Sequence, residues 1–267
     1  MDKAVILARG LGTRMRAEDS STELTSEQSA MAAQGIKALV PIDRPFLDYV
    51  MSGLADAGYR HVCLVIGPEH DLVRDYYGSI ERERIQIHFA VQEHPRGTAD
   101  AVSAAEEFSA SDPVLVLNSD NYYPPEALRA LRDLSTPGLA LFDRDSMLSS
   151  GNIDADRITK FAVGSTDADG RLLRVLEKPT PEVIDSLPKP VGVSMNCWRF
   201  HADIFEACRE IPPSARGELE LTDAVQYTID RGQTFQSLFF EAGVLDLTSR
   251  ADIETITEKL AGTTVTL

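Results

Sequence analysis

The first run of residues able to do chemistry lies close to the N-terminus. Residues 9–14 have the sequence Arg-Gly-Leu-Gly-Thr-Arg and follow an apolar segment that ends in Leu7 and Ala8. Glycines let backbone N–H groups approach phosphate oxygens closely, and Arg14 adds a fixed positive charge. The run therefore predicts a loop that binds a phosphate-bearing ligand.

A glycine-rich loop after a strand can also serve a different purpose. A dinucleotide-binding loop needs a third glycine where Met15 stands and a helix that starts at once, whereas a long polar segment, 16–34, follows here. The P-loop pattern Gly-x-x-x-x-Gly-Lys-Ser/Thr is absent. A tight strand exit without any ligand would use the same glycines, and the residues alone leave that alternative open.

The elements of the first half have the alternation that could position such a loop. Apolar runs predict strands at 3–8, 61–66, 84–92 and 114–117, and helical patterns lie between them at 45–58 and 98–108. Gly58 is the expected C-cap of the first helix. Strand–helix alternation predicts an α/β fold with a mainly parallel sheet, whose ligands bind beyond the carboxyl ends of the strands. The residues after Ala8, Gln92 and Leu117 should therefore meet at one mouth.

The second half has a different pattern. We expect strands at 157–163 and 171–177 around the turn 167–170, and a third strand at 191–200. Helices are expected near 202–210 and 218–231, strands near 234–240 and 243–247, and a last helix from about 250. These elements predict a mixed-sheet lobe over the mouth. The polar segment 16–34 is expected to be a mobile loop with some helix.

The glycine run resembles the Gly-x-Gly-Thr-Arg signature of sugar-1-phosphate nucleotidyltransferases, and residues 35–42, with Lys37, match the lysine segment that follows it in that family. The resemblance implies a Rossmann-like, mainly parallel sheet flanked by helices, within a single domain, 1–267. Residues 1–135 would bind the nucleotide, and 136–267 would form the sugar-binding lobe. It implies that Arg14 and Lys37 bind NTP phosphates and that the loop binds nucleotide through Leu7, Ala8, Gly10, Gly12 and Thr13.

Residues 91–101 resemble the element with which this family reads the base, usually uracil or thymine. By that resemblance, Gln92 and the backbone of Gly97 bind the nucleotide. A side-chain amide matches the donor and acceptor edge of a pyrimidine, and a glycine lets the backbone lie close to the base. Thr98 is a further nucleotide-site residue and the expected cap of the helix that follows.

Further resemblances supply a metal site and an acceptor site. Asp120 at a strand end and Asp246 in 243–248 match the two Mg²⁺ ligands of the family, although one such aspartate alone would be explained as a cap. Residues 177–179, Glu-Lys-Pro, imply that Lys178 binds the sugar phosphate. Sugar contacts are implied for Glu177, Asn196 and Glu218.

The resemblance implies a Mg²⁺-dependent enzyme that joins an NTP, with UTP or dTTP favoured, to a sugar 1-phosphate and releases pyrophosphate. Three departures leave alternatives open. Arg9 replaces a small residue and is shared with CTP-using relatives, the 22 residues between Arg14 and Lys37 are unusually many, and Val244 and Thr248 flank Asp246. A CTP- or GTP-dependent relative, a cyclitol phosphate acceptor and a non-catalytic nucleotide-sugar-binding regulatory subunit therefore remain alternatives.

Composition limits the remaining partners. A net charge of −16 disfavours nucleic acid and anionic membranes, and no apolar stretch approaches the length of a membrane span. The N-terminus lacks the features of a signal peptide, and three cysteines without metal-ligand spacing favour reduced thiols. A cytoplasmic protein is expected, and homo-oligomerisation stays open.

Overall fold

The computed structural model describes residues 1–19 and 22–267. Its strands are β1 (Lys3–Leu7), β2 (His61–Ile66), β3 (Gln86–Val91), β4 (Val114–Asn118), β5 (Asn121–Tyr122), β6 (Gly138–Asp143), β7 (Ala162–Thr166), β8 (Leu172–Leu176), β9 (Gly192–Phe200), β10 (Gln236–Phe240) and β11 (Leu245–Asp246). Its helices are α1 (Thr13–Arg16), α2 (Ser26–Gln34), the 3₁₀ turn η1 (Lys37–Leu39), α3 (Phe46–Asp56), α4 (Asp71–Ser79), α5 (Thr98–Ser103), α6 (Glu106–Ser109), α7 (Pro125–Asp133), α8 (Arg144–Ser150), α9 (Ala155–Ile158), α10 (Pro181–Ser186), α11 (Asp203–Glu210), α12 (Leu221–Ile229) and α13 (Asp252–Leu260).

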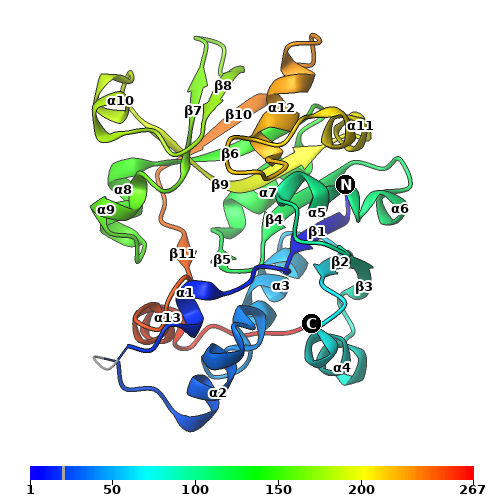
Figure 1. Ribbon diagram of the computed structural model, residues 1–267, viewed down its shortest axis with the longest axis vertical. Helices are drawn as coiled ribbons and strands as arrows, with labels where there is room; N and C mark the ends of the chain where they lie inside the picture. Colours follow the sequence, from blue (N-terminus) through cyan, green and yellow to red (C-terminus); the bar gives the residue numbers. More distant parts are fainter. Residues whose placement is uncertain (20–21) are drawn as a thin grey trace.

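The described residues form a nine-stranded central sheet with the order β10-β6-β9-β4-β1-β2-β3, from which β7 and β8 branch at β9 (Figure 1). The strands β3, β2, β1 and β4 pair in parallel, as do β10 and β6, whereas β9 runs antiparallel to both of its neighbours. The sheet is therefore mostly parallel, and helices cover both of its faces. This confirms the α/β fold expected from the sequence.

Alternation along the buried strands divides the core into two layers. In β1, Ala4 and Ile6 belong to one apolar cluster, which also contains side chains of α3, α7 and α13, while Val5 belongs to the cluster of α5, α11 and α12. Successive side chains of a strand point to opposite faces, so a run that is apolar throughout is buried on both sides. This burial holds the central strands in register.

The register places the ends of β1, β2, β3 and β4 at one edge. Leu7 pairs with Val65 on one side and with Asn118 on the other, and Ile66 pairs with Val91. The segments that follow these strands therefore lie together at the carboxyl edge, as the sequence analysis predicted. The two-stranded ribbon of β5 and β11 adds a segment from near the C-terminus to this edge, because Asn121 pairs with Asp246.

Two expected elements differ from those observed. The predicted strand 157–163 is wrong at its start, where α9 is helical and β7 begins only at Ala162. Ala155 and Asp156, which precede the predicted strand, begin α9, and both residue types are depleted in strands. The predicted helix 98–108 is interrupted at residues 104–105 and forms the separate helices α5 and α6.

The polar segment 16–34 ends in a regular helix. Thr25 and Gln28 form a reciprocal capping box at the start of α2, with both hydrogen bonds at 3.1 Å. Residues 20–21 of the expected mobile loop lie outside the described residues. The sequence analysis assigned no element to the segments that form α4, α7, α8, α10 and β6. Within the described residues, no helix is both long and apolar enough to cross a membrane.

Gly97 is the tightest point between the loop after β3 and the segment before α12. Its φ is +126°, and a Cβ added there would lie 2.4 Å from the carbonyl oxygen of Leu219. Both features require glycine, because this backbone region is essentially closed to other residues.

We predict that Gly97→Ala lowers the free energy of unfolding by at least about 2 kcal/mol, because the strained backbone and the contact with Leu219 must both relax. Gly78→Ala in α4 is the matched control, since a Cβ there meets nothing within 4 Å. It should stabilise the protein by about 0.5–1 kcal/mol, as alanine does in a helix. Urea unfolding of both variants measures the difference, and equal midpoints would contradict the prediction.

Candidate active site

The glycine loop after β1 packs against the end of α2. Gly12 has a φ of +60°, and a Cβ there would lie 2.3 Å from the carbonyl oxygen of Gly35, which itself has a positive φ. Arg16 also donates to the carbonyl of Gln34. Within the described residues, no backbone hydrogen bond occupies the N–H groups of Gly10 or Gly12. The end of α2 therefore fixes the loop in place, and the N–H groups of Gly10 and Gly12 stay available to bind an anion.

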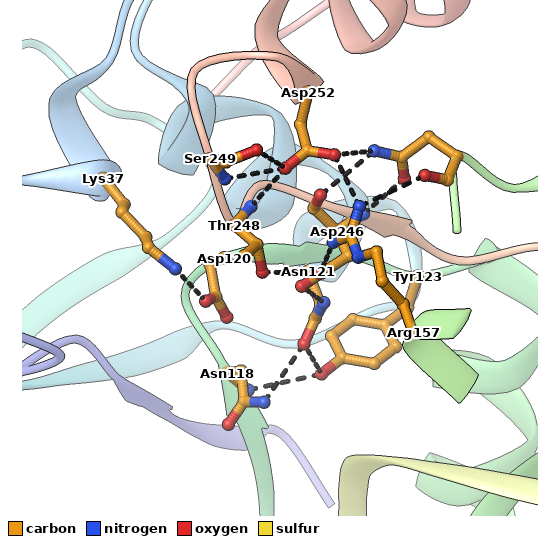
Figure 2. A network of polar contacts seen from close by, with 11 residues as sticks. Lys37, Asn118, Asp120, Asn121, Tyr123, Arg157, Asp246, Thr248, Ser249 and Asp252 are labelled. Atoms are coloured by element: carbon orange, nitrogen blue, oxygen red, sulfur yellow. Dashed lines mark hydrogen bonds and ion pairs between the residues drawn. The ribbon is translucent and has the colours of Figure 1, made fainter. Parts of the chain in front are cut away.

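Lys37 and Asp120 form the first ion pair of the site. The Lys37 Nζ atom lies 2.8 Å from Asp120 Oδ2, and both side chains are largely shielded from solvent. Lys37 is the first residue of η1, and Asp120 lies two residues after the end of β4 (Figure 2). The resemblance assigned one residue to phosphate and the other to metal, and the structure brings the two together.

Asp246 is the second carboxylate, and it is 3% exposed. Its Oδ1 accepts a hydrogen bond from Asn121 at 2.8 Å, and its Oδ2 accepts from Thr248 Oγ1 at 2.6 Å and from Arg157. Burial and the nearby charge of Asp120 raise the pKa of Asp246. The repulsion between the carboxylates makes a cation favourable at this position.

Arg157 links this carboxylate to a second buried aspartate, Asp252. Its guanidinium donates to Asp246 and, at 2.6 Å, to Asp252 Oδ1, while Asn152 Nδ2 donates to Asp252 Oδ1 and to the Asp246 carbonyl (Figure 2). Burial alone would lower the pKa of Arg157, but the two carboxylates raise it. Asp252 Oδ2 accepts from the backbone N–H groups of Thr248 and Ser249. The sequence analysis missed this network.

The two carboxylates and the neighbouring asparagines suit Mg²⁺, which takes oxygen ligands from one or two carboxylates and completes its shell with water and substrate phosphate. Asp120, Asn118, Asn121 and Asp246 line one pocket. Within the described residues, no cluster of three or more His, Cys, Asp or Glu side chains offers an all-protein cage. The donor set therefore fits a metal that is shared with a substrate.

Gln92, which the resemblance assigns to the base, is buried. Its Nε2 donates to the Gly97 carbonyl at 3.1 Å and to Asp100 Oδ2 at 2.8 Å. Its backbone carbonyl accepts from Arg9, whose guanidinium also lies 3.3 Å from Glu69. Arg9 thus braces the Gln92 segment against the loop after β2, where the sequence had left its role open.

Thr98 does not cap the helix that it begins. The N-cap residue of α5 is Gly97, without a side-chain hydrogen bond, whereas Thr98 Oγ1 accepts from the N–H of Leu221 at 2.9 Å. The predicted cap is therefore wrong: the hydroxyl serves the first residue of α12 instead. Together with the Gly97–Leu219 contact, this bond joins the nucleotide half to the second half.

The acceptor residues predicted from sequence are only partly brought together. Five of the predicted site residues line one pocket of about 150 Å³: Arg14, Asp120, Glu177, Asn196 and Asp246. Lys178 and Glu218 are exposed and do not line it.

Two of these acceptor residues sit on unusual backbone. Lys178 and Asn196 have φ values of +45° and +56°, which non-glycine residues seldom adopt, and such strain concentrates at functional sites. Asn196 Oδ1 accepts from Trp198 Nε1 at 3.3 Å.

Glu177 lies in an electrostatically crowded region. Its carboxylate is 3.7 Å from the Arg216 guanidinium, which also pairs with Glu220 at 2.6 Å. Burial and the charge of Glu220 raise the pKa of Glu177, and Arg216 opposes this. Arg216 lies two residues before Glu218, for which the resemblance implies a sugar contact, so its position in the sequence was a usable signal for this contact.

Comparisons with known proteins show which proteins the chain resembles. The chain is 30% identical over 254 residues to a glucose-1-phosphate thymidylyltransferase of Streptomyces antibioticus, covering 94% of this chain but 64% of that protein. It is 27% identical to a UTP–glucose-1-phosphate uridylyltransferase of Haloferax volcanii, covering 92% of this chain and 90% of that protein. The chain therefore spans less than two thirds of the length of the first of these relatives.

Solved structures share the fold. A UDP-glucose pyrophosphorylase complexed with UDP-glucose superposes with a TM-score of 0.73 at 18% identity, over 97% of both chains. A putative glucose-1-phosphate thymidylyltransferase from Bacillus anthracis gives 0.73 at 21% identity, over 99% of this chain and 97% of that one. The nucleotidyl transferase family profile matches residues 3–261, and the chain belongs to that family.

Proposed function

We propose that this chain joins an NTP to a sugar 1-phosphate, forming an NDP-sugar and pyrophosphate. The observation that carries the proposal is that two carboxylates, Asp120 and Asp246, line one pocket together with Arg14 and the predicted acceptor residue Glu177. Such a pocket suits the joining of two phosphate-bearing substrates around a shared cation. One relative is named a thymidylyltransferase and another a UTP-dependent uridylyltransferase, which supports dTTP or UTP as the nucleotide.

The bond changes need no covalent intermediate on the protein. An oxygen of the acceptor phosphate attacks the α-phosphorus of the NTP, the bond between the α-phosphorus and the bridging oxygen breaks, and the electron pair leaves with pyrophosphate. The protein's tasks are to align the reactants and to neutralise charge. Mg²⁺, held by Asp120 and Asp246, would supply Lewis-acid stabilisation of the phosphate oxygens.

The remaining residues divide between the substrates. The free N–H groups of the Gly10–Gly12 loop and the exposed Arg14 face the nucleotide phosphates, and Lys37 holds its ammonium beside Asp120 where their negative charge would gather. Gln92 and Gly97 bind the base. Glu177, Asn196 and Glu218 serve the sugar, and Lys178 reaches the acceptor phosphate from the rim of the site.

The reaction is tested by pyrophosphate release, with a panel of NTPs crossed against a panel of sugar 1-phosphates, with and without Mg²⁺. Release that requires one NTP, one sugar phosphate and Mg²⁺ together is the expected result. Nucleotide binding without release from any pair, under conditions where a known transferase is active, would contradict the proposal and favour a regulatory protein.

Asp120→Asn should lower turnover at least ~10²-fold, because the variant loses one charged group that stabilises the transition state. Asp133→Asn is the control, since its carboxylate is 74% exposed at the end of α7 and remote from the pocket. Steady-state rates at limiting Mg²⁺ measure both variants. Wild-type turnover in Asp120→Asn would refute the metal assignment.

A further inference from the structure

Lys160 is a lobe residue that the sequence analysis did not single out, and it lines the same pocket as Asp120, Glu177 and Asp246. It lies two residues after α9 and is exposed. Among the described residues, its ammonium group has neither a hydrogen bond nor an ion pair. Lys160 therefore offers three unused donors and a positive charge to the pocket.

The backbone of Lys160 is well anchored. Its N–H donates to the Arg157 carbonyl at 2.9 Å, and the Arg157 side chain is held by Asp246 and Asp252. Just after it, Ala162 pairs with Ser194 in the sheet. The backbone of Lys160 is thus held in place before any ligand binds. This reduces the backbone conformational entropy that is lost on binding.

The positively charged side chains that line the pocket come from different halves of the chain. Its two cations are Arg14, from the nucleotide loop, and Lys160, from the opposite lobe; neither has a carboxylate partner among the described residues. Lys37 and Arg157, by contrast, are already paired with Asp120 and Asp246. Lys178 does not line this pocket. Two anionic substrates therefore meet two unpaired cations, one from each half of the chain.

The pocket lining contains a second polar group without a hydrogen-bond partner among the described residues. Ser194 lines the pocket, and its buried hydroxyl has no hydrogen-bond partner among the described residues. Buried polar groups are nearly always satisfied, so an unpaired hydroxyl on a pocket wall indicates a missing partner, such as an oxygen of a ligand. It lies on the lobe side of the pocket, as Lys160 does.

We propose that Lys160 binds the phosphate group of the sugar 1-phosphate. This inference rests on the proposed function. It assigns to the acceptor phosphate a binding residue that is distinct from Lys178. The ammonium neutralises the charge of the attacking phosphate as it approaches the triphosphate, whose charge is met by Arg14 on the other side. In the product, the same phosphate is the one attached to the sugar, so the contact persists in the NDP-sugar.

The test compares UDP-glucose and UDP, which both carry this phosphate, with UMP, which lacks it. Calorimetric titration of Lys160→Met should show affinity for UDP-glucose and for UDP weakened about 10- to 100-fold, the range for one charged hydrogen bond, and affinity for UMP unchanged. Lys160→Arg should recover most of the loss. Lys189→Met, an exposed lysine of the same lobe, is the control and should match wild type. In turnover, the KM for the sugar phosphate should rise while that for the NTP stays constant.

Each other result overturns the inference. Unchanged UDP-glucose binding in Lys160→Met would show that the lysine makes no contact with this phosphate. An equal loss for UMP and UDP-glucose would show an effect on the nucleotide or on the fold. A selective loss in Lys178→Met alone would assign the acceptor phosphate to that residue. Because binding is measured without turnover, failure of the proposed reaction in the wild type would be seen separately.

Discussion

Repulsion between two carboxylates is the constraint around which this molecule is arranged. Asp120 follows the central strand β4, and Asp246 is almost fully buried in β11, which pairs with the strand β5 that begins just after Asp120. Burial and the charge of Asp120 raise the pKa of Asp246. Lys37 and Arg157 balance the two carboxylates by direct ion pairs. A buried carboxylate beside a second negative charge is tolerated only with such partners, or with a metal ion.

Balancing these charges ties together parts of the chain that are far apart in sequence. Arg157 lies 89 residues before Asp246 and 95 before Asp252, so a single guanidinium joins the lobe to the C-terminal ribbon and to the start of α13. Asp252 in turn fixes the backbone of Thr248 and Ser249. The position of Asp246 therefore depends in part on the lobe that carries Lys160, because Arg157 of that lobe holds its carboxylate.

The sequence predicted β1, β2 and β4 because each is a short apolar run that is buried along most of its length, and polar motifs follow β1 and β4. Asp120, which follows β4, lines the pocket for this reason, whereas Asn196 lies within β9 and the strand β6 was not predicted. The lobe was predicted less well: its helices are short, and Arg157 was placed in a strand although its conformation is set by two distant aspartates. Thr98 shows the same limit, since its partner is the N–H of Leu221, 123 positions away.

The most direct measurement is the binding of Mn²⁺, as a substitute for Mg²⁺, in the presence of UTP, followed by the relaxation rate of water protons. Manganese immobilised on a protein raises that rate. If Asp120 and Asp246 jointly hold a cation beside the triphosphate, wild type should show the enhancement, and folded Asp246→Asn should lose most of it. An equal enhancement in both proteins would show that this carboxylate holds no metal, and would contradict the arrangement inferred for the site.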